Sequence, residues 1–155
     1  MSSRLRPFGL LLTLAAAVAV TGCSSNADEL NGTWSGTDTL SNGTQVSDTV
    51  TLTANNGNIS GQFVASVNGG TIYMGTFSGV YTSPNLTFTV TVPAGAVTNQ
   101  PNCSLQLTNG TAIFVNSSSG STNPSKSLTG SVTITPNGSC TIPATTDQFM
   151  WTMAG

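Results

Sequence analysis

The chain has 155 residues, and only 5% of them are charged, against roughly 25% in an ordinary soluble domain. Ser, Thr, Asn and Gly make up about half of the sequence, histidine is absent, and the cations are Arg4, Arg6 and Lys126. This composition argues against nucleic-acid binding, which needs many cations, and against imidazole-based catalysis or metal sites. We therefore expect no nucleic-acid partner, no metal and no cofactor.

The first 22 residues have the pattern of a signal peptide. Arg4 and Arg6 precede a mostly apolar run at residues 8–20, which is shorter than the ~20 residues of a membrane-spanning helix. The run ends in Val20-Thr21-Gly22-Cys23, which resembles the lipobox of bacterial lipoproteins. The resemblance implies cleavage before Cys23 and a diacylglyceryl group on its thiol. The alternative is an ordinary secretory signal in which Cys23 is incidental.

Residues 23–30 are predicted to form a lipidated tether. Ser24 follows the cysteine, which by analogy with enterobacterial sorting favours the outer membrane. Residues 23–155 contain one Lys and five acidic residues, a formal net charge of −4. Such a chain offers no cationic patch to lipid headgroups, so we expect the covalent lipid alone to hold it at the membrane.

Alternating apolar and polar residues predict a single all-β domain over residues 31–155. One packed face and one wet face per strand favour antiparallel pairing. Asn-Gly pairs at Asn42, Asn56, Asn68, Asn109 and Asn137 indicate tight turns. We predict strands at 33–41, 45–54, 58–67, 71–81, 85–92, 103–108, 111–116, 127–135 and 147–154. A meander of eight to ten strands is expected to close into a barrel, which removes its edges, with a β-sandwich as the alternative.

The first predicted strand opens with Gly32-Thr33-Trp34, and this resembles the Gly-x-Trp that begins the first strand of lipocalins. The resemblance implies an up-and-down barrel whose closed end is plugged by Trp34. A barrel of this kind often binds a small apolar ligand inside.

Six residues are candidates for the lining of such a pocket: Trp34, Asp38, Tyr73, Phe77, Tyr81 and Trp151. Asp38 shares a strand face with Trp34, so its carboxylate would point inward, where an unpaired charge is costly and can mark a function. The simpler interpretation is that the aromatic residues are ordinary core. Asp38 together with Asp147 is also the basis of a hydrolase hypothesis, which no flanking motif supports.

The remaining cysteines, Cys103 and Cys140, form an even pair in an exported domain and predict a disulfide. A metal site would need more ligands, and a redox pair more usually has the C-x-x-C spacing.

The sequence therefore predicts a lipid-anchored protein of the bacterial envelope, in the outer membrane, that is not an enzyme. Its expected role is to bind a small apolar ligand or an envelope protein. The alternatives are a structural or interaction module with a packed barrel, acting through loops 93–102 and 117–126, and the Asp-based hydrolase.

Overall fold

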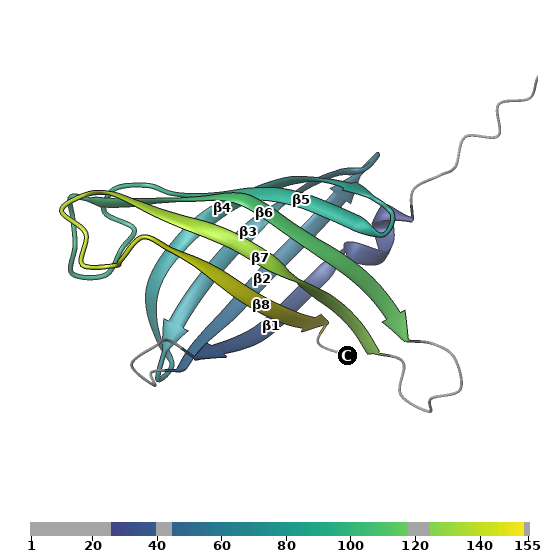
Figure 1. Cartoon of the computed structure of the whole chain (residues 1–155), viewed down its shortest axis with the longest axis horizontal. Coiled ribbons are helices and arrows are strands. Elements are labelled where there is room, and N and C mark those ends of the chain that lie inside the picture. Colours follow the sequence, from purple (N-terminus) through teal and green to yellow (C-terminus); the bar gives the residue numbers. More distant parts are fainter. Residues whose placement is uncertain (1–25, 40–44, 118–124, 154–155) are drawn as a thin grey trace, which may run out of the picture.

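The chain folds as a closed antiparallel barrel (Figure 1). This computed structural model describes residues 26–39, 45–117 and 125–153, apart from the side chains of residues 38 and 39. A short 3-10 helix, η1 (Ala27–Leu30), precedes the strands. The strands are β1 (Gly32–Thr39), β2 (Gln45–Asn55), β3 (Asn58–Val67), β4 (Gly70–Thr82), β5 (Asn85–Val92), β6 (Cys103–Ser117), β7 (Ser125–Gly138) and β8 (Thr145–Met153). Within these ranges, no helix is long and apolar enough to cross a bilayer.

Each strand pairs with the next one along the chain, and β8 returns to β1. This seam pairs Trp34 with Met153 and Ser35 with Thr152. Closure satisfies the backbone groups that an open sheet would expose at its two edges. The predicted antiparallel meander barrel is thus confirmed, and the sandwich alternative is wrong.

Two of the predicted Asn-Gly turns are confirmed. Asn56 and Gly57 join β2 to β3 with φ values of 50° and 83°, and Asn68 and Gly69 join β3 to β4 with values of 49° and 78°. Positive φ at both central residues is typical of a type I′ turn, whose twist matches that of the flanking strands. The pair beginning at Asn42 lies outside the described residues.

The pair Asn109-Gly110 does not form a hairpin, so the prediction of separate strands at 103–108 and 111–116 is wrong. β6 runs through both segments, and its pairing with β7 passes from Thr108 directly to Thr111. Only Asn109 has positive φ, at 52°, which gives a bulge rather than a reversal. Gly110 is needed for another reason, because a Cβ there would lie 2.7 Å from the ring of Phe88.

The two predicted loops have different outcomes. Residues 93–102 do connect β5 to β6, and Val97 forms an isolated bridge with Tyr73 of β4. The loop predicted at 117–126 is shorter, because β6 extends to Ser117 and β7 begins at Ser125. The residues between those two strands lie outside the described part of the chain.

One end of the barrel is closed by η1 (Figure 1). Ala27 and Leu30 of this helix are buried, and the indole Nε1–H of Trp34 donates to the Leu30 carbonyl at 2.9 Å. The Lys126 ammonium donates to the carbonyl of Glu29 at 3.3 Å. Trp34 is fully buried beneath η1, at the closed end of the barrel. The resemblance of the first strand to lipocalins implied this position.

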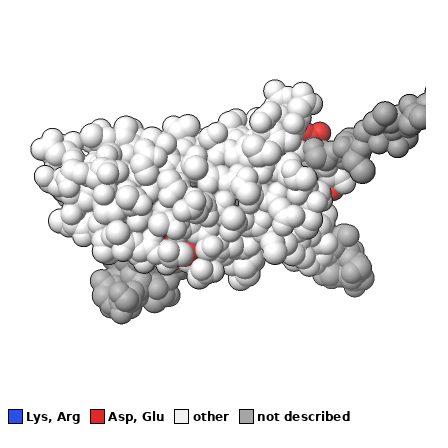
Figure 2. Space-filling view, turned by 45° about the horizontal axis from the view of Figure 1, so that its top comes forward, with Lys and Arg blue, Asp and Glu red and all other residues white. Residues whose placement is uncertain are grey.

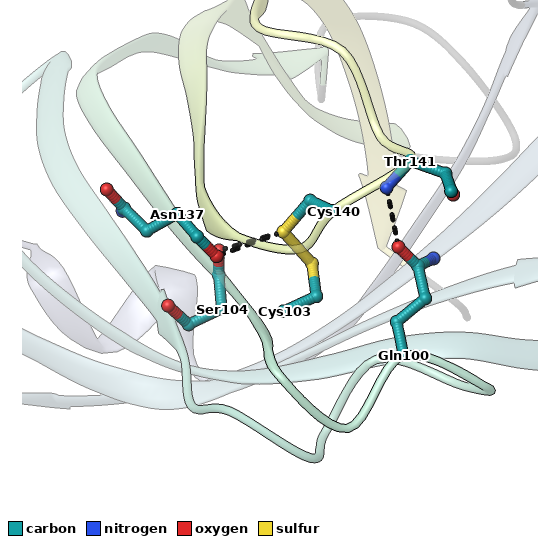
Figure 3. Close-up of a disulfide and its surroundings, with 6 residues drawn as sticks. All are labelled: Gln100, Cys103, Ser104, Asn137, Cys140 and Thr141. Atoms are coloured by element: carbon teal, nitrogen blue, oxygen red, sulfur yellow. Dashed lines mark hydrogen bonds between the residues drawn. A yellow bond between two sulfur atoms is a disulfide. The ribbon is translucent and has the colours of Figure 1, made fainter.

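The disulfide lies at the opposite end, beside the loops on the left of Figure 1. Cys103 at the start of β6 is bonded to Cys140 in the β7–β8 connection, with 4.7 Å between their Cα atoms (Figure 3). Beside it, the Thr141 backbone N–H donates to Gln100 Oε1 at 2.6 Å and joins the two connecting loops. The predicted cysteine pairing is confirmed.

We expect the double substitution Cys103→Ala/Cys140→Ala to lower the free energy of unfolding by about 4 kcal/mol, because a cross-link over 37 residues restricts the unfolded chain. Urea unfolding of the full chain measures the loss, and reduction of the parent chain with dithiothreitol serves as the matched control, because it opens the same cross-link without changing a side chain. An unchanged urea midpoint in the double variant would contradict the expectation.

Candidate functional site

The structure places five of the six predicted pocket residues inside the barrel. Trp34, Phe77 and Trp151 are fully or almost fully buried, and Tyr73 and Tyr81 are less than a tenth exposed. The backbone of the sixth, Asp38, pairs with Val46 of β2, and its side chain lies outside the described residues. Cys23, the predicted lipid anchor, also lies outside the described residues.

These aromatic residues do not line one common wall. Trp34 and Tyr81 each meet the edge of Phe114 at 6.2 Å between ring centroids, near the end closed by η1. Phe77 stacks on Phe88 at 4.7 Å, farther along the barrel. The rings are thus distributed along the interior and fill it.

A second aromatic cluster surrounds Trp151. Its indole stacks on Phe149 with 4.0 Å between centroids and meets Phe63 at 6.0 Å. Phe63 in turn stacks on Tyr73 at 5.8 Å. Aromatic pairs at such distances are worth more than the apolar area they bury, so they stabilise a filled interior.

The enclosed space left beside this cluster is small. Its volume is about 10 Å³, which is the room of about one water molecule. Pockets for drug-sized ligands have roughly 300–1,000 Å³. The residues around it are Asp48, Phe63, Tyr73, Phe88, Leu107, Val132, Ile134, Asp147, Phe149 and Trp151.

Two carboxylates border this space, and they come from β2 and β8, the two strands that neighbour β1. Asp48 of β2 is only 6% exposed, and Asp147 of β8 is half-buried. Burial raises the pKa of Asp147 above its usual value of 3.8, and a hydrogen bond with the Gln148 backbone works in the opposite direction. The inward position of Asp48 was readable from the sequence, because it alternates in register with Val46, Val50 and Leu52.

The two buried indoles differ in their hydrogen bonding. Trp34 Nε1 donates to the Leu30 carbonyl, whereas Trp151 Nε1 is buried with no hydrogen-bond partner. A buried donor that lacks an acceptor costs roughly 1–3 kcal/mol. Trp151 therefore contributes through ring packing alone.

Larger hollows lie on the outside of the barrel wall. One, of about 840 Å³, runs over β3, β4, β5 and β6 and includes Ser60, Ser78 and Thr89. A second, of about 410 Å³, continues over β5 to β8 and includes Thr129 and Ser131. Both hollows include Thr87 and Thr111. The outward threonines of β5 alternate with buried residues in the sequence, but no local pattern marks the hollows that they border.

The described residues contain no group of three or more His, Cys, Asp or Glu side chains that could hold a metal ion. No protein-family model matches the chain, and comparisons with curated proteins and with solved structures find no match either. The candidate sites therefore rest on the geometry of this chain.

The two indoles provide a matched pair of substitutions. We expect Trp34→Phe to lower the free energy of unfolding by about 1 kcal/mol more than Trp151→Phe does, because only the former removes a formed hydrogen bond. Both changes remove the same ring atoms from a buried site. The difference between the two losses therefore gives the contribution of the Trp34 hydrogen bond to the free energy of unfolding. Urea titrations of the two variants give it, and a larger loss in Trp151→Phe would contradict the expectation.

The raised pKa of Asp147 predicts a pH dependence of stability. The folded chain holds this proton more tightly than the unfolded chain, so the free energy of unfolding falls as pH rises from 3.8 through the folded-state pKa. Asp147→Asn keeps an acceptor at this position and does not titrate. We therefore expect the variant to gain in melting temperature relative to the parent chain between acidic and neutral pH.

Thermal unfolding between about pH 3 and pH 7 measures this difference. Asp28→Asn removes an exposed carboxylate of η1 and controls for the loss of one charge. A melting-temperature difference between Asp147→Asn and the parent chain that stays constant with pH would rule out the assignment.

Proposed function

We propose that this chain is a lipid-anchored, non-catalytic protein of the bacterial envelope that binds its partner on the outside of a filled barrel. The observation that carries the proposal is the packing of aromatic rings inside the barrel, which leaves a space of only about 10 Å³ beside Trp151. A ligand of ordinary size has room only outside.

The anchor is supported by the basic, apolar and lipobox segments that lead to Cys23. Three residues lie between Cys23 and Ala27, so even a fully extended tether of four Cα–Cα steps is only about 14 Å long. Because Ala27 begins the helix that closes the barrel, this end lies near the membrane and the disulfide end faces away from it. In this orientation the barrel axis points away from the membrane, so the outer wall is exposed to solvent and accessible to partners.

The low charge of the barrel is consistent with this arrangement. Figure 2 shows a face without Lys or Arg and with acidic residues only at a few places near its margins. Such a surface gains little from contact with charged lipids or polyanions. The lipid then provides the attachment and the wall provides the binding surface. A small apolar ligand inside the barrel has less support, because the aromatic rings occupy that space.

The anchor can be tested by labelling cells with radioactive palmitate. We expect Cys23→Ser to abolish the label and to move the protein from the membrane fraction to the soluble fraction, because one thiol carries the acyl chains. Ser25→Ala changes a neighbouring residue and should leave the label and the fractionation as they are. Label that persists on Cys23→Ser, or its absence from the parent chain, would defeat the proposal of a lipid anchor.

A further inference from the structure

Exposed apolar side chains gather toward the end of the barrel that η1 closes. Among the described residues, five large hydrophobic side chains are about half exposed, and four of them lie on the later parts of β4, β6 and β8: Val80, Ile113, Val115 and Met150. The fifth, Met74, lies in the first half of β4, nearer the other end. The exposed apolar surface of the described wall is therefore uneven along the barrel axis.

Val115 lies beside η1. It is followed on β6 by Asn116, whose partner in the sheet is Lys126, and the Lys126 ammonium donates to the Glu29 carbonyl of η1 at 3.3 Å. The end of β6 and η1 accordingly lie at the same end of the barrel in Figure 1. Ile113 faces outward two residues earlier on the same strand. These two side chains therefore form an apolar pair close to the closed end.

The other exposed apolar residues lie on either side of this pair. Met150 of β8 is level with Ile113 and is separated from it by β7 alone. On the other side, the carbonyl of the exposed Pro84 accepts a hydrogen bond from the Phe114 backbone N–H at 2.8 Å, so the β4–β5 turn lies against β6. Val80 lies near the end of β4, just before that turn. We call these five residues the apolar margin: Val80, Pro84, Ile113, Val115 and Met150.

The wall around the apolar margin is uncharged. Its outward-facing neighbours on β5 and β7 are Asn85, Thr87, Ser127 and Thr129. The acidic residues that the structure describes on η1 are Asp28 and Glu29. A charged partner would find no group of opposite sign on the margin, so any attraction to this surface depends on its apolar side chains.

The proposed tether favours a membrane over a protein as the occupant of this surface. With three residues between Cys23 and Ala27, the end that η1 closes stays within about 14 Å of the proposed acyl chains. The tether would thus hold the apolar margin at the bilayer surface, at a high effective concentration. Its five side chains are also fewer than the roughly 20–30 residues that each partner contributes to a stable protein interface.

We infer that the apolar margin is a docking surface for the lipid bilayer to which the chain is anchored. The inference rests on the proposed lipid anchor and adds how the barrel lies: the acyl chains attach it, and the barrel inclines toward its β4–β8 side until the margin meets the headgroup region. Half-exposed apolar side chains are removed from water when they enter the boundary between headgroups and acyl chains. The wall toward the disulfide end stays in water, where the proposed partner binds.

Nitroxide spin labels on single new cysteines test this contact, because Cys103 and Cys140 are bonded to each other and the Cys23 thiol is proposed to carry lipid. The lipidated full chain is reconstituted in phosphatidylcholine vesicles, and collisions with a water-soluble nickel complex are measured by electron paramagnetic resonance. We expect severalfold fewer collisions at Val115→Cys than at Met74→Cys. The two positions are matched, since their side chains are 46% and 48% exposed.

A second comparison tests whether the apolar side chains cause the protection. With the label at Val80→Cys, the double substitution Ile113→Thr/Val115→Thr keeps β-branched residues on the strand and should raise the nickel collisions toward the Met74→Cys value. The control is Val64→Thr/Met74→Thr, an outward-facing pair of cross-strand partners on β3 and β4 outside the margin. It should leave the collisions at the Val80 label unchanged.

Equal nickel access at Val115→Cys and Met74→Cys, or no effect of the Ile113/Val115 substitutions, would overturn the inference. Protection that appears only after anionic phosphatidylglycerol is added would do the same, because the margin carries no positive charge. Dipolar coupling between labels on two chains would assign the margin to a second copy and would also overturn it. A parent chain without acyl groups would defeat the proposed anchor itself, whereas a lipidated chain whose margin stays in water defeats this inference alone.

Discussion

An eight-stranded barrel encloses a volume that side chains can just fill. This volume limits what else the interior can hold, and the other features of the molecule depend on it. Here the space is taken by aromatic rings, among them Trp34, Phe77 and Trp151, packed against aliphatic residues from β2, β3, β5, β6 and β7. Closure of β8 onto β1 makes this filling possible, because it gives each strand one dry face and one wet face. The space beside Trp151 has room for about one water molecule, and for this reason the proposed binding of a larger molecule is assigned to the outer surface.

Closure also leaves few sheet edges to protect in a chain that has few charges. Many exposed strands are protected by Lys or by other charges at the sheet edge, and this chain has almost none. Every strand has a neighbour on both sides, although the seam between β1 and β8 pairs only Trp34 with Met153 and Ser35 with Thr152. The outward side chains of the described strands are mostly hydroxyls and amides, so the wet face of the barrel is nearly neutral.

The two ends of the barrel are stabilised by different contacts. At one end η1 is held by the Trp34 hydrogen bond and by Lys126, and this helix follows the tether directly. At the other end the Cys103–Cys140 disulfide joins the loops that follow β5 and β7. The proposed anchor at Cys23 is close in sequence to this helix, so the proposal puts the η1 end of the barrel nearest the membrane.

The sequence alone was enough for the class of fold, most strand positions, two tight turns and the disulfide, because alternation and turn chemistry are local and the cysteines offered one pair. It also indicated that Trp34, Tyr73, Phe77, Tyr81 and Trp151 point inward, as the structure shows. Only the tertiary structure decided that Asn109-Gly110 is a bulge within β6, since the two neighbouring strands hold it straight and Phe88 packs on Gly110. It likewise decided that five of the predicted pocket residues fill the barrel instead of lining a pocket. Packing volume and cross-strand register depend on all the strands together, so no local pattern contains them.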